Sequence, residues 1–254
     1  MEHNWSCVDL HRVQVISFDV AFTLLGLNVY RISELVQKHL DIPCTPAQLM
    51  NMERAIRGEY TRNYDKSHAV QGKCITEIMT EMISRQPHLS IDVKTIDAFH
   101  SALQKSHLQT NLFQIIYHDA LAALDYIKEF TGLKLIVISN APVTLRRDLE
   151  RIGLLHYFDH VLGSAEEGVG KPDPEIFTRA ADRCGVKIED ILHIDDNPHV
   201  GVLAAQRAGM QAVLYDPEFC FYPRMIPAPV IKNHLELARR LSVTQENRDD
   251  FYWL

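Results

Sequence analysis

The 254 residues include 33 acidic and 26 basic side chains, which gives a formal net charge of −7, and 46% of the residues are hydrophobic. This composition supports a buried core, and the lack of a basic tract argues against a nucleic-acid partner. No run of about 18 apolar residues or signal peptide is visible, so we expect a cytoplasmic protein without a membrane span. The five cysteines are scattered without CxxC spacing, which suggests reduced thiols rather than disulfides or a zinc site.

The first regular element is an apolar run, Val13 to Phe18, that stops at Asp19. Dense β-branched and aromatic residues over such a short run predict a buried strand. An acid directly after that strand would lie at the carboxyl edge of a sheet, where open parallel sheets bind their ligands. On its own, a strand-terminal aspartate is better explained as the start of a simple turn. Three later segments of the chain favour the ligand-binding interpretation.

Residues 29–112 show helical periodicity and no convincing strand. Thr45 is a good N-cap for a helix that follows Pro43, and a stripe from Ile75 to Ile83, rich in methionine, is typical of core packing. Several helices in a row, between segments that carry strands, predict an inserted helical bundle.

From residue 115 onward, helix-like and strand-like segments alternate. We expect helices over 115–130, 144–155, 175–184, 202–208 and 229–241, and strands over 133–141, 158–166, 191–194 and 211–216. This alternation predicts an α/β fold with a doubly wound parallel sheet.

Polar residues follow several of the predicted strands. They are Asp19, the pair Ser139-Asn140, Lys171 in the loop GKPDP, and the pair Asp195-Asp196. At a common carboxyl edge these side chains would converge in one crevice. Carboxylates together with phosphate oxygens suit Mg²⁺, a lysine and a hydroxyl suit a phosphoryl group, and an aspartate can act as a nucleophile.

In this order, the four segments resemble the four motifs of the haloacid dehalogenase superfamily, over roughly residues 13–240. The resemblance implies a Rossmann-like core, residues 1–26 and 113–254, with an all-helical cap, residues 27–112, inserted after the first motif. It further implies a Mg²⁺-dependent phosphatase that forms an aspartyl-phosphate on a small phosphorylated metabolite. The oligomeric state stays open between monomer and homodimer.

The resemblance also assigns roles to residues. It makes Asp19 the nucleophile, with Ser139 and Lys171 holding the phosphoryl group and with Thr23 and Asn140 as further substrate contacts. The implied Mg²⁺ ligands are Asp19, Asp196 and the main-chain carbonyl of Ala21, joined by Asp195.

Two positions depart from the family's pattern. Ala21 stands where phosphatases of this superfamily usually carry the aspartate that protonates the leaving group, and the loss of a general acid/base typically costs about 10²–10⁴ in rate. Gly201 stands where a further acid is expected after Asp196. Asp195, at a position that is often glycine, is the residue that we expect to supply that acid.

Three interpretations follow from these departures. The first is a phosphatase that is slow, or that recruits its acid/base from the cap or from the substrate, and His199 is a further candidate for the missing proton shuttle. The second is a hydrolase of carbon–phosphorus bonds, which would need a cap lysine, Lys66 or Lys73, for a Schiff base. The third is a catalytically weakened protein that binds a phosphorylated ligand or a protein partner.

Overall fold

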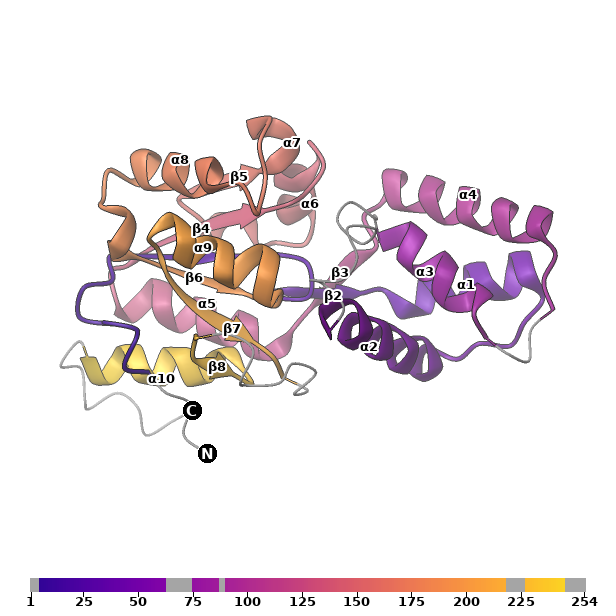
Figure 1. Cartoon of the computed structure of the whole chain (residues 1–254), viewed down its shortest axis with the longest axis horizontal. Helices are drawn as coiled ribbons and strands as arrows, with labels where there is room; N and C mark the ends of the chain where they lie inside the picture. The colour runs from indigo at the N-terminus through magenta and orange to yellow at the C-terminus, as the bar shows by residue number, and fades with distance from the viewer. Residues whose placement is uncertain (1–4, 63–74, 87–89, 218–226, 245–254) are drawn as a thin grey trace. The chain divides into compact units, whose positions relative to one another are not determined.

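The computed structural model describes residues 5–62, 75–86, 90–217 and 227–244. The chain divides into two compact units, residues 1–26 with 116–254 and residues 27–115 (Figure 1). Within the described ranges, no helix is long and apolar enough to cross a membrane.

The first unit is built on a six-stranded sheet with the order β5-β4-β1-β6-β7-β8. Its strands are β1 (Val15–Phe18), β4 (Lys134–Ser139), β5 (His160–Gly163), β6 (Ile191–Asp195), β7 (Gln211–Tyr215) and β8 (Val230–Ile231), and every pair is parallel. From β1 the chain proceeds outward through β4 and β5 and then crosses back to β6. The predicted doubly wound parallel sheet is therefore confirmed, with the carboxyl ends of β4, β1 and β6 side by side at its switch point.

Helices cover both faces of this sheet. On one face, Val15 and Ile191 pack with α8 (Pro174–Cys184) and α9 (Ala204–Ala208). On the other face, the rings of Phe18 and Tyr215 lie 6.2 and 4.2 Å from His234 of α10 (His234–Thr244), which packs on α5 (His118–Phe130). Figure 1 shows α8 on one side of the sheet and α5 and α10 on the other. Two shorter helices, α6 (Leu145–Arg151) and α7 (Ser164–Glu167), follow β4 and β5.

The second unit is helical, with α1 (Val29–Leu40), α2 (Pro46–Arg62), α3 (Ile75–Ser84) and α4 (Val93–Gln109). Helix α1 packs on α2 and α4, and α3 packs on α4. Met79 and Met82 are fully buried, so the methionine stripe belongs to the core as expected. Thr45 caps α2, since its hydroxyl accepts a bond from the Gln48 amide while the Gln48 side chain accepts one from the Thr45 amide.

Three short strands were not expected from the sequence, and α7 (Ser164–Glu167) takes the place of the end of the strand that we expected over 158–166. Residues 115 and 116 belong to β3 (Phe113–Ile116), which pairs with β2 (Leu25–Leu27), and the helix that we expected from residue 115 begins only at His118. Strand β8 takes up residues 230–231, so the last helix begins at His234 instead of 229. Such strands are too short to show a period of two, and their partners lie far away in the sequence.

Candidate active site

Two neighbouring strands carry a row of polar side chains on one face of the sheet. Ser17 on β1 and His193 on β6 are direct partners in the parallel register. Asp19 lies two residues after Ser17 and Asp195 two residues after His193, so all four side chains point to the same face. Phe177 of α8 packs against this face, where its ring and the His193 ring form a T-shaped pair with 5.5 Å between centroids. The row is buried, and Asp19 at 6% is its most exposed member.

Lys171 closes this row from the loop that precedes α8. Its ammonium donates to Asp19 Oδ1 at 2.7 Å and to Asp195 Oδ2 at 2.5 Å. The side-chain amide of Asn140 holds the loop, because it donates to the Lys171 carbonyl at 2.7 Å and accepts from the Lys171 amide at 2.8 Å. A Cβ at Gly170 would lie 2.6 Å from Asn140 Oδ1, so the close approach of the loop requires glycine there.

The segment after Asp19 turns sharply and brings Thr23 to Asp196. Phe22 adopts a left-handed conformation, with φ of 60°, which is costly for a bulky residue and is found mostly at functional sites. The Thr23 hydroxyl accepts a bond from the Asp196 amide at 3.1 Å and lies 3.4 Å from Asp196 Oδ1. Ala21, whose carbonyl is a predicted metal ligand, lies at the start of this turn and forms an isolated bridge with Leu25.

The three acids of the site lie close enough to share one cation. Oxygen atoms of Asp19, Asp195 and Asp196 all lie within 4.8 Å of one another, and all three residues are buried. Three carboxylates (−3) and the Lys171 ammonium (+1) leave a formal charge of −2. A buried set of oxygen ligands with that charge fits a divalent cation such as Mg²⁺.

Burial and charge shift the pKa values of this cluster in different directions. Burial raises the pKa of Asp19, although Lys171 and a hydrogen bond from Ser139 act to lower it. For Asp195, burial also acts to raise the pKa, but Lys171 and His193 outweigh it and hold that pKa at about 2. Burial acts to lower the pKa of Lys171, yet the two aspartates raise it above its usual value. Strongly perturbed groups in one cluster are typical of functional sites.

The structure brings together most of the residues predicted for the site. Asp19, Ser139, Lys171, Asp195 and Asp196 converge at the carboxyl edge, with Thr23 and Asn140 bonded to Asp196 and to the Lys171 main chain. His199 lies on a π-helical turn, Pro198–Leu203, and its amide donates to Asn197 Oδ1. The candidate cap lysines, Lys66 and Lys73, lie outside the described residues.

Sequence reasoning missed Ser17 as part of the cluster and treated His193 only as a core histidine. His193 is fully buried, as expected, but its imidazole lies 2.8 Å from the Ser17 hydroxyl and 3.1 Å from Asp195 Oδ2. Burial lowers the pKa of His193 despite the opposing effect of Asp195, so the ring is held neutral. The signal in the sequence is the matched spacing of Ser17-x-Asp19 and His193-x-Asp195 in two adjacent strands.

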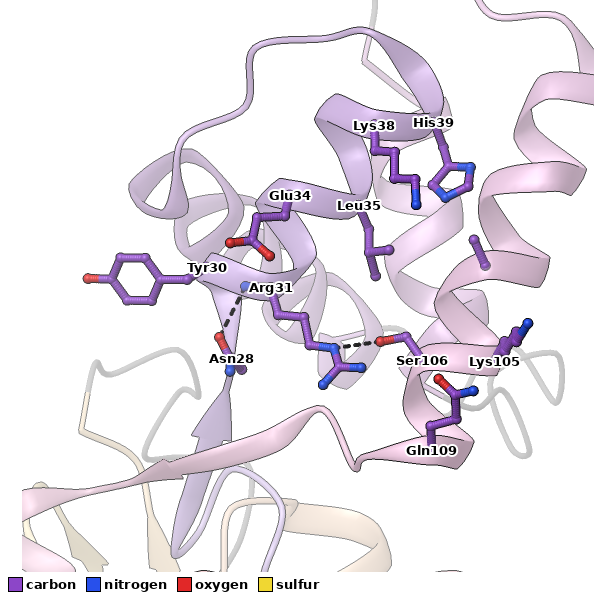
Figure 2. A pocket seen from close by; sticks show the side chains of 11 residues that line it. Asn28, Tyr30, Arg31, Glu34, Leu35, Lys38, His39, Lys105, Ser106 and Gln109 are labelled. Atoms are coloured by element: carbon purple, nitrogen blue, oxygen red, sulfur yellow. Dashed lines mark hydrogen bonds between the residues drawn. The ribbon is translucent and has the colours of Figure 1, made fainter.

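A separate cavity of about 770 Å³ lies in the helical unit, between α1 and α4, and shares no residue with the polar cluster (Figure 2). Its lining carries Arg31, Lys38 and Lys105 as cations and Glu34 as an acid. Arg31 Nε donates to Ser106 Oγ at 2.7 Å, whereas Lys38, Lys105 and Glu34 are exposed. The cavity is therefore an open, positively charged surface hollow rather than a buried reaction centre.

Known proteins share both the sequence and the fold. The chain is 27% identical over 209 residues to the glyceraldehyde 3-phosphate phosphatase of Methanopyrus kandleri, covering 79% of this chain and 83% of that protein. It is 31% identical over 161 residues to the enzyme of the same name from Methanothermobacter thermautotrophicus, covering 58% of this chain and 68% of that protein. A shorter match, 42% over 86 residues and 34% of each chain, is to the phosphoserine phosphatase of Thermus thermophilus.

Among solved structures, the HAD hydrolase YfnB of Bacillus subtilis, crystallised with magnesium, superimposes with a TM-score of 0.64 at 18% identity and covers 91% of this chain and 99% of that one. This similarity concerns the fold. The family model for haloacid dehalogenase-like hydrolases matches residues 34–209. The chain therefore belongs to the haloacid dehalogenase-like hydrolase family.

Proposed function

We propose that this hydrolase is a Mg²⁺-dependent phosphatase that acts on a small phosphorylated metabolite through an aspartyl-phosphate at Asp19. The observation that carries the proposal is the buried Lys171 ammonium, 2.7 Å from Asp19 Oδ1, beside three carboxylates with a formal surplus of two negative charges. This arrangement combines a nucleophile, a fixed positive charge and a cation site at one strand edge. The phosphatases among its relatives support the same reaction class.

In the first step, a carboxylate oxygen of Asp19 forms a bond to phosphorus while the bond to the ester oxygen breaks. Lys171 neutralises charge on the phosphoryl oxygens, and Ser139, which also hydrogen-bonds Asp19, orients the group. A bound Mg²⁺, held by Asp19, Asp196 and the Ala21 carbonyl, would supply further charge neutralisation. In the second step, a water oxygen forms a bond to phosphorus while the bond from Asp19 to phosphorus breaks, which restores the Asp19 carboxylate. The water proton leaves with the released inorganic phosphate or passes to solvent.

Position 21 provides no side chain that can donate a proton to the leaving alkoxide. The methyl group of Ala21 carries no proton, so the donor must be another residue, the substrate or water. His199 follows Asp196 by three residues and is the candidate in this chain. We therefore expect slow turnover, with a loss of about 10²–10⁴ relative to a site with an acid at residue 21.

The same alanine favours a second candidate function. A chain with the phosphoryl-binding groups but without the proton donor could bind a phosphorylated ligand and not turn it over. A third reading, cleavage of a carbon–phosphorus bond, needs a lysine that forms a Schiff base with a carbonyl substrate.

The deciding experiment measures phosphate release with and without Mg²⁺ from a panel of small phosphoesters that includes glyceraldehyde 3-phosphate and phosphoserine. The unmodified chain is compared with D19N and A21D. Turnover in the unmodified chain that is lost in D19N supports the phosphatase. An inert unmodified chain with active A21D supports the binder instead. If all three chains are inert toward phosphoesters, and phosphate release from a carbonyl phosphonate requires Lys66 or Lys73, cleavage of a carbon–phosphorus bond replaces the phosphatase as the proposed activity.

A further inference from the structure

The hollow between α1 and α4 carries positive charge in a protein that is negative overall. Arg31 and Lys38 line it from α1 and Lys105 lines it from α4, and Glu34 is the acid among its described lining residues. These side chains sum to a formal charge of +2, whereas the whole chain carries −7. All of them belong to residues 27–115, so the hollow lies within the helical unit. Like charges around one hollow repel one another, and a bound anion would remove that repulsion.

The guanidinium of Arg31 is held at one edge and unused at the other. Its Nε donates to Ser106 Oγ at 2.7 Å, from α1 to α4 (Figure 2), and Ser106 is only 6% exposed. Its main-chain amide donates to Asn28 Oδ1 at 3.1 Å, which fixes the first turn of α1. Within the described ranges, no hydrogen bond or ion pair engages Nη1 or Nη2 of Arg31. A guanidinium that is oriented through Nε, with both Nη groups available, fits two oxygens of a phosphate or carboxylate group.

The place of Arg31 in its helix strengthens the positive potential. Arg31 is the third residue of α1, and the first turn of that helix contains no acid. A helix N-terminus carries a partial positive charge, so a cation there is unfavourable and an anion is favoured. Lys38 and His39 lie in the last turn of the same helix, where a basic residue is favourable without any ligand. That explanation does not account for Arg31.

The size of the hollow indicates a ligand with more than one anionic group. Its volume of about 770 Å³ would stay mostly empty around a single phosphate ion, and pockets of about 300–1,000 Å³ typically hold small organic ligands. Arg31 and Lys38 are seven residues apart in one helix, which corresponds to about 10 Å along its axis. Phosphate groups, with close to two negative charges each at about pH 7, match three cations better than carboxylates do.

We propose that this hollow is a second ligand site, which binds a small molecule with two phosphate groups, one at the Nη pair of Arg31 and one toward Lys38. An extended polyanion such as a nucleic acid fits less well, because the cations are confined to one hollow in a chain of net charge −7. The proposal does not rest on phosphatase activity, since the site shares no residue with the polar cluster.

The first test measures the binding of fructose 1,6-bisphosphate to the D19N chain by calorimetry in the presence of a chelator. D19N removes the proposed nucleophile and the chelator removes the metal, so the probe is not consumed and the result does not depend on turnover. Inorganic phosphate is the comparison with one anionic group. We expect the bisphosphate to bind at least about tenfold more tightly than phosphate, with an affinity that falls as salt is added. R31K, which keeps the charge and loses the planar fork, should weaken binding of the bisphosphate about tenfold.

Lys94 offers the matched control for Lys105. It is an exposed lysine of the same helix, α4, that does not line the hollow. In the D19N chain, K105Q should weaken binding of the bisphosphate about two- to fivefold, whereas K94Q, with the same change of charge, should leave it unchanged. Because Lys105 is exposed, this comparison holds even if R31K lowers stability through the lost bond to Ser106. Equal affinities of K105Q and K94Q overturn the proposal, as does a bisphosphate that binds no more tightly than phosphate.

A second measurement locates the bound probe without any substitution in the hollow. Acetic anhydride modifies exposed lysine amines, and mass spectrometry follows the rate at each lysine with and without fructose 1,6-bisphosphate. We expect the rates at Lys38 and Lys105 to fall at least about threefold, because a bound anion keeps an amine protonated and unreactive. The rate at Lys94 should not change. Unchanged rates at Lys38 and Lys105 under saturating bisphosphate would show that the hollow is not the site, and would overturn the proposal.

Discussion

The polar cluster in the sheet unit and the cavity in the helical unit differ in burial, in hydrogen bonding and in formal charge. In the cluster, the groups are buried and mutually bonded, and the net formal charge is −2. In the cavity, about 770 Å³ is open, and three cations and one acid leave a formal charge of +2 on side chains that are mostly exposed (Figure 2). The groups of the cluster are buried and bonded to one another, whereas the cavity is open and is lined mostly by exposed charges.

The difference shows that the size of a hollow is a poor guide to reaction chemistry in this fold. A reaction needs groups whose orientation is set before the substrate arrives, because reorganisation of exposed charges costs much of their effect. Burial and strand register provide that order around Asp19, whereas Lys38 and Lys105 remain exposed.

The largest effect should come from removing the central cation of the cluster. K171M leaves the buried carboxylates of Asp19 and Asp195 without their bonded ammonium, and we expect a loss of about 3–5 kcal/mol in the free energy of unfolding, together with loss of turnover. The measurement is urea unfolding at pH 7 in the presence of a chelator. K105M at the cavity is the matched control, and an exposed lysine there should change stability by less than about 0.5 kcal/mol. Equal losses of unfolding free energy in K171M and K105M would contradict the expected difference between the buried cluster and the exposed cavity.

Within the cluster, the two bonded aspartates should affect stability with opposite signs. The pKa of Asp195 is lowered from 3.8 to about 2, so its charge stabilises the fold above pH 4 and that contribution is lost as the pH falls toward 2. The pKa of Asp19 is raised, so its charge costs stability at neutral pH. We expect D195N to be less stable at pH 7 by about 2 kcal/mol, and D19N to be more stable.

Chemical unfolding of the metal-free variants from pH 7 to pH 2 measures whether each substitution raises or lowers the free energy of unfolding. The deficit of D195N should vanish as the pH falls from about 4 toward 2, because both chains then lack that charge. A destabilised D19N at pH 7 would mean that the Asp19 carboxylate is a net stabilising partner of Lys171.

A smaller effect is expected where the lysine loop approaches Asn140. G170A would place a methyl group 2.6 Å from Asn140 Oδ1 and from Ser164 Cβ. We expect a loss of about 1–2 kcal/mol and a lower kcat, because the loop that carries Lys171 must shift. Thermal unfolding and phosphate release measure both effects. G168A is a useful comparison, since no atom lies within 4 Å of a Cβ there and its cost comes only from the positive φ of 68°.

The sequence was sufficient for the parts of the fold that repeat a strong local pattern. The runs that end at Asp19, Ser139 and Asp195 are dense enough in β-branched residues to indicate buried parallel strands, and the order of their polar ends indicated one shared edge. The sequence did not predict the pairing of the two short strands near residues 25 and 115, because three or four residues are too few to show the alternating pattern of a strand.

The finer roles in the site depend on pairing that a single sequence does not display. Ser17 looks like a small residue within an apolar strand until the register places it opposite His193. The reason for Gly201 becomes visible only when the Asp195 carboxylate is found in the space beside it. The cavity between α1 and α4 likewise depends on how two helices pack, and the helical periodicity did not indicate it.

The smallest effect should come from the cavity itself. In R31A, the bond from Arg31 Nε to the buried Ser106 hydroxyl is lost, which should cost about 1 kcal/mol of stability because the hydroxyl then lacks that donor. The value of kcat should stay within about twofold, since Arg31 takes no part in orienting Asp19 or Lys171. Urea unfolding and steady-state kinetics measure these two quantities, with K38A as a control that removes an exposed cation from the same hollow. A tenfold fall of kcat in R31A, with KM unchanged, would show that the cavity contributes to the chemical step and that fixed geometry is not confined to the strand edge.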